Sequence, residues 1–467
     1  MKRILAFVIL LTLPLGFLIG AHKAVGGLQD DVTVTPTHVY GDPERVAGVT
    51  FRTLTTCGNH MWWYTDHTPG DPGVTETEFH FSQKGHGFFD LHTDWQDFNL
   101  TNNNGMGMST SGGDGLEFAD EGMGILLNAV AEKTLPGETR EETMVLSDYF
   151  EYYPLEYTVN LRTEDYFLDE MYDPIRHAAS SQGPWEEMGE KSYRQWNEYF
   201  RFPVQPGDTV NVIVGKDDRG AVMEIGLHTD GNENGVHIGF TAIAVDNGMY
   251  FAPVFQRWNS GEVIESGEYV YGYGLYYIPL KPAEGIHGDR PAMTFDFEGL
   301  ELVHSLAPTD RLIAMEESAD GMGLHLLTME DGVYIYSLLD ISGRELLDRT
   351  EILQTDADAR WAFYPEQELL YLMAGDKAAL VTTGEKSRVE FTAAWPEEVQ
   401  WVVPTQVRYT GGVLYGTSLE WHEKARGVCL MALDEKGLGY LGYYISNLNG
   451  SGYNSSWVNL EEGEFAE

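Results

Sequence analysis

A hydrophobic hairpin pattern recurs in the C-terminal half of this 467-residue chain. Each copy has an apolar strand, a polar turn and a second strand, and the copies span residues 324–340, 369–384 and 413–434. They begin about 45 residues apart, and a weaker fourth copy spans residues 249–280. Repeats of about 40–50 residues with paired strands are typical of four-stranded sheets that follow one another along a chain. The pattern therefore predicts an all-β architecture of repeated antiparallel sheets.

These hairpins resemble the strand pairs of exported β-propeller proteins in their general pattern. The resemblance covers about a third of the chain, without a WD dipeptide, kelch signature or sialidase-type Asp-box. It implies a β-propeller-like domain over residues 33–467. It implies no particular activity, because one fold carries many chemistries. The alternative is an N-terminal β-sandwich up to about residue 165, followed by a smaller propeller.

One region, from about residue 165 to 202, interrupts the strand pattern. Pro184 precedes a segment, residues 185–200, whose aromatic residues recur at roughly helical intervals. Proline is favoured at the first position of a helix, so this segment is expected to be helical. Together with residues 165–172, it predicts an insertion that contains one or two short helices.

The N-terminus carries an uncharged apolar run, residues 4–19, behind two basic residues. A membrane-spanning helix needs about 17–25 apolar residues, so this run lies at the short limit, and Pro14 interrupts it. A cleaved signal peptide is the competing interpretation, with Ala21 just before the cut. We expect residues 1–24 to be a signal peptide or, preferably, a membrane anchor, and residues 25–32 to be a linker. Both interpretations place the rest of the chain outside the cytoplasm.

The formal net charge is −44, from 73 acidic and 29 basic residues. Such a chain repels nucleic acids, because their binding depends on Lys and Arg side chains that neutralise phosphates. It repels anionic lipid headgroups for the same reason. We therefore expect no nucleic-acid partner, and membrane contact only through the N-terminal helix if that helix is retained.

The segment that begins at Asp230 matches the first half of a calcium-binding loop. Asp230, Asn232 and Asn234 supply side-chain oxygens at positions 1, 3 and 5, and Gly235 stands at position 6. The second half departs, because Thr241 occupies the position of the bidentate Glu. A polar hairpin turn would use the same residues. Calcium is therefore the possible cofactor at this loop, and otherwise we expect none, because the sequence contains no Walker A loop and no HExxH pair.

Histidines and carboxylates also gather at two places near the N-terminus. His60, Asp66 and His67 are close in sequence, as are His92 and Asp94. Strand alternation would place His92 and Asp94 on one face, where they could bind zinc or another divalent ion. Exposed polar strand faces have the same composition, so these groups are weak metal candidates.

Trp62 and Trp63 are candidates for stacking against a glycan. Successive residues of a strand face opposite sides, so one is expected in the core and the other at the surface. Cys57 and Cys429 are the two cysteines of the chain. The propeller resemblance places them in the first and last blades, where a disulfide could close the ring. Two unrelated thiols are the alternative.

No motif names a reaction, and no catalytic residue is assigned. We expect a non-enzymatic extracytoplasmic binding or scaffolding module with a glycan or protein partner. A secreted carbohydrate-active hydrolase is the runner-up, and a sensor or accessory subunit of a membrane complex is the third candidate. An enzyme should have a deep polar cleft with converging carboxylates, whereas a binding module should have a shallow aromatic patch.

Overall fold

The structure is a computed structural model. It describes residues 12, 16–17, 19–20, 23–24, 26–57, 60–82, 95–101, 108–111, 115–162, 166–171, 175–177, 184–228, 236–245, 247–257, 263–264, 267–287, 290–384, 386–422, 425–448 and 454–460. Most of the apolar run at residues 4–19 lies outside this set. Within it, no helix has the length and apolar character needed to span a membrane.

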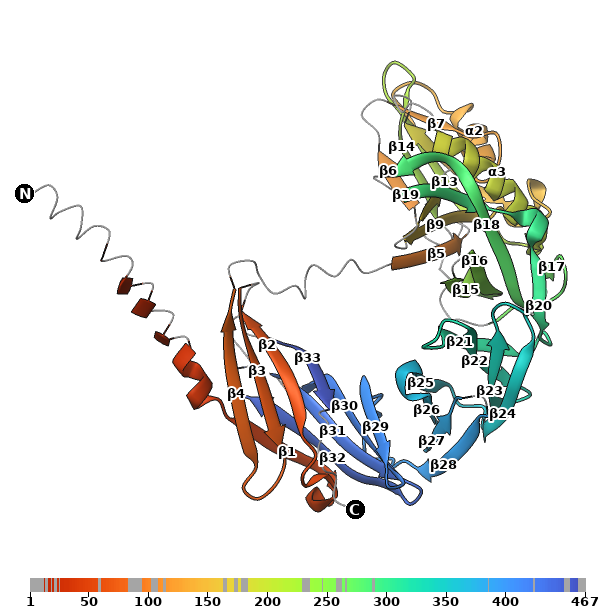
Figure 1. The fold of residues 1–467 in the computed structure, drawn as a ribbon. Helices are drawn as coiled ribbons and strands as arrows, with labels where there is room; N and C mark the ends of the chain where they lie inside the picture. Colours follow the sequence, from red (N-terminus) through yellow and green to blue (C-terminus); the bar gives the residue numbers. More distant parts are fainter. Residues whose placement is uncertain are drawn as a thin grey trace, which may run out of the picture. The chain divides into compact units, whose positions relative to one another are not determined.

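Sheets of mainly antiparallel strands make up most of the described chain, with one parallel pair, β10–β19 (Figure 1). The chain divides into two compact units, the first of residues 1–92 and 348–467 and the second of residues 93–347. The sequence pattern predicts one domain over residues 33–467, whereas the structure divides this range into two units. The first unit is discontinuous because the two ends of the chain fold together.

The described residues of the first unit form three sheets, in which adjacent strands run antiparallel. Their strands are β1 (Val34–Gly41), β32 (Gly437–Ser446), β31 (Ala425–Asp434), β30 (Val413–His422) and β29 (Gln406–Thr410); β33 (Asn454–Leu460), β2 (Phe51–Cys57), β3 (Met61–Thr68) and β4 (Val74–Phe81); and β25 (Ala359–Tyr364), β26 (Leu369–Ala374), β27 (Lys377–Thr382) and β28 (Arg388–Ala394). Two of the predicted hairpins are confirmed here as the pairs β26–β27 and β30–β31.

The two ends of the chain exchange strands within this unit. The N-terminal strand β1 pairs with β32 near the C-terminus, and the C-terminal strand β33 pairs with β2 (Figure 1). Two of the three sheets therefore contain one strand from the opposite end of the chain. This pairing excludes the alternative of a separate N-terminal sandwich, because β1 and β2 need partners from beyond residue 430.

The second unit contains larger and more irregular sheets. Its strands are β6 (Met108–Ser111), β14 (Val222–His228), β13 (Thr209–Lys216) and β8 (Thr139–Val145) in one sheet; β16 (Gly248–Arg257), β15 (Val236–Val245), β5 (Trp95–Thr101), β9 (Glu156–Arg162), β10 (Phe167–Met171), β19 (Arg290–Phe295), β18 (Gly274–His287) and β20 (Glu301–Ser305) in another; and the pairs β7 (Leu116–Phe118) with β11 (Ile175–His177) and β12 (Phe200–Arg201) with β17 (Glu268–Tyr269). The weak hairpin of residues 249–280 corresponds to β16 and β18, which pair directly.

A further four-stranded sheet follows the chain order. It contains β21 (Arg311–Glu317), β22 (Gly323–Glu330), β23 (Val333–Asp340) and β24 (Leu346–Gln354). The third predicted hairpin, residues 324–340, is confirmed as the pair β22–β23. All three strong repeats are thus the central strand pairs of four- or five-stranded sheets, which is the pattern of propeller blades.

Two α-helices lie in the described part of the second unit, and the sequence predicted one of them. Helix α3 (Pro184–Tyr199) begins at the expected proline. The prediction of one or two short helices is thus met by one, because β10 (Phe167–Met171) takes the place of the optional second helix and pairs with β9. Helix α2 (Gly124–Ala131) was not predicted, because its eight residues are too few to show a helical period.

Buried aromatic and aliphatic side chains form separate cores in the two units. In the second unit, Trp196 of α3 is fully buried among phenylalanine rings. In the first unit, one cluster lies between sheets β25–β28 and β29–β32, and another lies between β2 and the sheet of β30–β32. The second of these clusters forms the floor of the site described next.

Candidate functional site

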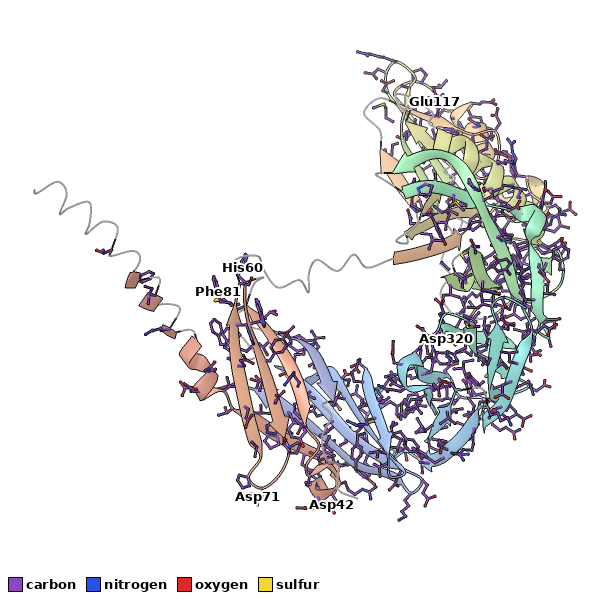
Figure 2. The ribbon with its side chains drawn as sticks, viewed as in Figure 1. Asp42, His60, Asp71, Phe81, Glu117 and Asp320 are labelled. Atoms are coloured by element: carbon purple, nitrogen blue, oxygen red, sulfur yellow. The ribbon has the colours of Figure 1, made fainter. Side chains whose placement is uncertain are left out.

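A cavity of about 540 Å³ opens between two sheets of the first unit. One wall comes from β3 and the turn between β3 and β4, and the other from β1, β32 and the 3₁₀ helix η2 (Pro43–Val46). Figure 2 shows Asp42 and Asp71 at this end of the sheets, and His60 and Phe81 at the opposite end. The cavity therefore lies at this end of the β2–β4 hairpins, and its exposed lining residues there, among them Glu44 and Asp71, are here called its mouth.

Four aromatic side chains that line the cavity form a continuous surface, here called the aromatic wall: His67, Tyr444, Tyr440 and His38. The ring centroids of His67 and Tyr444 are 5.4 Å apart, and those of Tyr440 and His38 are 5.9 Å apart. Phe51 supports the wall from behind, 5.2 Å from Tyr444. These separations are those of favourable aromatic contacts, so the wall is a packed surface.

His67 is held in one orientation by the strand register. It lies opposite Thr75 across the β3–β4 ladder, and its Nδ1 is 2.8 Å from Thr75 Oγ1. The side chain is only 3% exposed, and burial lowers its pKa from 6.5 to about 4. At neutral pH the imidazole is therefore uncharged. Among the described residues, its Nε2 has no hydrogen-bond partner.

The hydroxyl groups of Tyr440 and Tyr444 contact each other above Gly442 in β32. Their hydroxyl oxygens are 2.8 Å apart, and a Cβ atom at Gly442, between them in the strand, would lie 2.2 Å from the Tyr440 hydroxyl. Burial raises the pKa of both phenols, so both are neutral at physiological pH. One hydroxyl donates to the other, and the accepting hydroxyl keeps its own O–H. The two side chains are only 2% and 4% exposed, so the pair mainly packs the cavity side of β32.

The mouth of the cavity carries two exposed carboxylates, Glu44 and Asp71. Asp42 Oδ1 accepts a hydrogen bond from the Glu44 backbone N–H and fixes the start of η2. Arg45, the neighbouring cation, is bound to Asp434 instead. In the described part of the chain, the cavity lining includes no Lys or Arg, so the mouth is negatively charged.

Two glycines allow close packing beside the wall. Gly41 has φ +78° and lies so close to β32 that a Cβ atom there would be 2.0 Å from the Gly439 carbonyl oxygen. Its carbonyl accepts a hydrogen bond from His38 Nε2 at 2.8 Å. A Cβ atom at Gly73 would lie 3.2 Å from His67 Cε1. Larger side chains at either position would displace part of the wall.

His67 should make the stability of the first unit pH-dependent. Its pKa is about 6.5 when unfolded and about 4 when folded, so between these values the unfolded chain binds more protons. The free energy of unfolding should therefore fall as the pH drops through this window, by about 3 kcal/mol at most. Urea titrations of wild type and His67→Gln at pH 7 and 4.5 would measure it.

His325 of the second unit provides the matched comparison. Burial lowers its pKa to about 4 as well. His325→Gln should remove a similar pH dependence, but from the unfolding of the second unit. An identical pH dependence of stability in wild type and His67→Gln would contradict the assignment to His67.

The structure separates the two tryptophans that the sequence proposed for ligand stacking. Trp63 is 0% exposed and packs in the core against Phe79, so its assignment to a binding surface was wrong. Trp62 is half-buried on the other face of the sheet, stacked on His80 at 5.7 Å. The expectation that one residue faces the core and the other the surface is confirmed. Neither tryptophan lines the cavity.

The two cysteines are free, so the predicted disulfide is not formed. Cys57 is the last residue of β2 and lies opposite Met61 in the hairpin. Cys429 lies within β31, where it is buried in a core with Leu414 and Met431. Burial raises the pKa of the Cys429 thiol, so the group stays protonated. The two side chains belong to different surroundings because their strands lie in different sheets.

The residues proposed as metal ligands either lie apart in the structure or lie outside the described residues. Asp230, Asn232 and Asn234 lie outside them, as do His92 and Asp94. Asp66 forms a two-point ion pair with Arg52 on the sheet face opposite His67, at 2.7 Å. His60 binds the Ser82 carbonyl at the far end of the sheet. Among the described residues, no group of three His, Cys, Asp or Glu side chains could hold a metal ion.

Sequence reasoning singled out His67 but missed the rest of the aromatic wall. The available signal was the Tyr-x-Gly-x-Tyr spacing of Tyr440, Gly442 and Tyr444, which places the three residues on one face of a strand. A glycine between two tyrosines leaves space for their hydroxyls to meet. His38 had no such signal, because its place beside Tyr440 depends on the exchanged strand β1.

Comparison with known proteins yields distant likenesses of fold. No protein-family profile and no curated protein matches this chain. A putative 6-phosphogluconolactonase from Bacteroides fragilis aligns over 89% of this chain and 98% of its own, with 9% identity and a TM-score of 0.28. A β-propeller domain from Myceliophteria thermophila aligns over 50% of this chain and 79% of its own, with 12% identity and a TM-score of 0.21. These scores give no information on activity.

Proposed function

We propose that this protein is a non-enzymatic extracytoplasmic binding module whose ligand occupies the cavity of the first unit. The cavity itself carries this proposal. Cavities that bind small molecules are concave and largely apolar, with a few polar groups that set orientation. The cavity of about 540 Å³ is concave and has apolar and polar lining residues, with the carboxylates Glu44 and Asp71 at its mouth. Of the four rings of the aromatic wall, His38 is exposed, and His67, Tyr440 and Tyr444 are almost completely buried.

The wall residues are poorly suited to catalysis. The Thr75 hydroxyl and His67 Nδ1 have the 2.8 Å separation of a nucleophile and its base. A general base works best with a pKa near the working pH, whereas the pKa of His67 is about 4. Glu316, whose pKa is raised by burial, lies in β21 and does not line the cavity. These observations support binding without turnover.

The same proposal includes the setting of the module. The repeated four-stranded sheets and the exchanged terminal strands support a propeller-like frame that carries the cavity. The apolar run of residues 4–19 supports export, with the N-terminal helix as a membrane anchor. Mass spectrometry of the mature N-terminus tests this point, because a chain that starts at His22 would be a released protein.

Ligand binding can be tested with a variant that fills the cavity. Ala47 lines the cavity at the end of η2, and Ala47→Phe should occupy space that a ligand needs. A panel of neutral, cationic and anionic compounds, including glycans, would be screened by thermal unfolding. A ligand at 100 times its Kd should stabilise the wild type by about 2.7 kcal/mol and leave Ala47→Phe unchanged.

Ala359→Phe is the matched control, because Ala359 is half-buried at the start of β25, away from the cavity. This variant should bind the same compounds as the wild type. Mass spectrometry after incubation should recover each bound compound unchanged. Conversion of the compound, or equal stabilisation of Ala47→Phe, would contradict the proposal.

A further inference from the structure

We infer that the outer edge of β4 binds an extended, basic segment of a partner protein as an additional strand. This site is separate from the cavity, so it goes beyond the proposed function. Three observations support it: the regularity of β4, the direction of its backbone groups, and the charge of its exposed side chains.

Strand β4 is the last strand of its sheet, and among the described residues no strand pairs with its outer side (Figure 1). It pairs with β3 at every position from Val74 to Phe81, without a bulge. Natural edge strands are commonly protected by a proline or a bulge. The edge strand β1 has both, with Pro36 and a register shift between His38 and Tyr40, whereas β4 has neither. The edge of β4 is therefore regular enough to pair with another strand.

Alternate residues of β4 direct their backbone groups away from β3. The Phe79 N–H donates to Gln29 Oε1 at 3.1 Å, and Gln29 belongs to the 3₁₀ helix η1 (Gly27–Asp31) outside the sheet. At the end of the hairpin, the Ser82 N–H donates to the His60 carbonyl instead, on the β3 side. Because the directions of antiparallel pairing alternate along a strand, odd-numbered residues of β4 face outward and even-numbered residues face β3.

This alternation makes Thr75 and Thr77 the open pairing positions of the edge. Both present their backbone N–H and C=O groups on the same outer side as Phe79. The Gln29 side chain is an amide, so its oxygen is the same type of acceptor as the carbonyl of a peptide bond. An amide from outside the sheet thus already binds this edge. An added strand would extend this kind of contact to Thr75 and Thr77 through main-chain hydrogen bonds.

The charge of β4 selects the kind of strand that can be added. Glu76 and Glu78 are exposed, and β4 contains no Lys or Arg. Glu78 lies 3.4 Å from His80 in a contact that is open to solvent, because its side chain is 75% exposed. Across a strand pair, opposite charges stabilise and like charges destabilise. The two carboxylates therefore oppose the pairing of β4 with a second copy of itself, and they favour a strand with Lys or Arg at alternate positions.

The probe is a synthetic peptide, capped at both ends, with the sequence Thr-Lys-Val-Lys-Val-Lys-Thr. A peptide with Glu in place of each Lys is the comparison. Hydrogen–deuterium exchange of the full-length protein should become slower in residues 74–81 when the Lys peptide is added. Fluorescence anisotropy should show that the Lys peptide binds at least about tenfold tighter than the Glu peptide, because favourable charge pairs replace unfavourable ones.

Charge reversal on β4 should invert this preference. Glu76→Lys/Glu78→Lys should bind the Glu peptide at least about tenfold tighter than the Lys peptide, since the backbone edge is kept and the charges are exchanged. Glu397→Lys/Glu398→Lys is the matched control, because these exposed carboxylates of the same unit follow β28. This variant undergoes the same change of net charge and should still prefer the Lys peptide.

Thr77→Pro tests the backbone of the edge. Proline removes the outward N–H of residue 77 and keeps the hydrogen bonds to β3, which is the arrangement in which edge strands tolerate proline. This variant should bind the Lys peptide at least about tenfold more weakly than the wild type. Thr77→Val is its matched control, because it removes the same hydroxyl and keeps the N–H, and it should bind the peptide as the wild type does. Circular dichroism of both variants checks that they are folded.

The inference is wrong if neither peptide slows exchange in β4, or if the wild type and Glu76→Lys/Glu78→Lys prefer the same peptide. In that case the carboxylates only protect the edge. Equal binding of the Lys peptide to Thr77→Pro and Thr77→Val would also overturn it, because binding would then depend on charge without strand pairing. Ala47→Phe should bind the Lys peptide as the wild type does, so the outcome is independent of the ligand proposed for the cavity.

Discussion

Removal of residues 449–467 should unfold the first unit under conditions in which the full-length protein is stable. The deletion takes away β33, which pairs with β2 at six positions from Phe51 to Thr56. Without it, one edge of β2 loses its hydrogen-bond partners, and the sheet keeps only three strands. At about 1 kcal/mol for each net hydrogen bond, the loss should be at least about 3 kcal/mol. Urea unfolding, followed by circular dichroism, would measure it.

Deletion of residues 461–467 alone is the control, because it leaves β33 intact and should keep the stability of the full-length protein. A synthetic peptide of residues 449–467 should restore part of the lost stability when it is added to the truncated protein, since the exposed edge of β2 can accept a strand. Unchanged unfolding of the truncated protein would contradict the role assigned to the exchanged strand.

Trp196→Ala should destabilise the second unit by about 3–5 kcal/mol. The Trp196 side chain is 0% exposed, and its ring contacts five phenylalanines at centroid distances from 5.0 to 6.4 Å. Replacement by alanine would leave a cavity in the centre of this cluster and separate α3 from the sheet strands that supply the rings. The free energy of unfolding of the purified variant is the measurement.

Trp421→Ala is the matched control, because the Trp421 side chain is 71% exposed. A surface substitution of this kind should change stability by no more than about 0.5 kcal/mol. Equal effects of the two substitutions would show that the aromatic cluster around Trp196 contributes little to the second unit.

Short windows of the sequence predicted the hairpins, because the two strands of a hairpin are neighbours in the chain. The strands of β22–β23, β26–β27 and β30–β31 follow each other in the chain, so their apolar runs and polar turns are visible in short windows. The exchange of β1 and β33 was not visible, because each strand pairs with a segment about 400 residues away. A strand pattern contains no information on the identity of a distant partner.

In the candidate site, too, contacts within one hairpin could be predicted from the sequence, and contacts between distant segments could not. The alternation rule predicted that Trp62 and Trp63 face opposite sides, and the structure agrees. It could not tell which residue faces the core, because the answer depends on the sheet that packs against β3. The aromatic wall combines His38, His67 and Tyr440, three segments that meet only after the terminal strands have been exchanged.

The exchange of terminal strands also determines when the strands of the first unit can pair during synthesis of the chain. The first unit combines residues 1–92 with residues 348–467, and β33 begins at residue 454. At about 5–20 residues per second, β33 is made roughly 20–80 s after β2. During this delay β2 has an edge without its partner, and β1 waits for β32. Unpaired edges of this kind invite pairing with other chains. Any factor that holds the unfinished chain in a soluble form therefore has to shield these two strands.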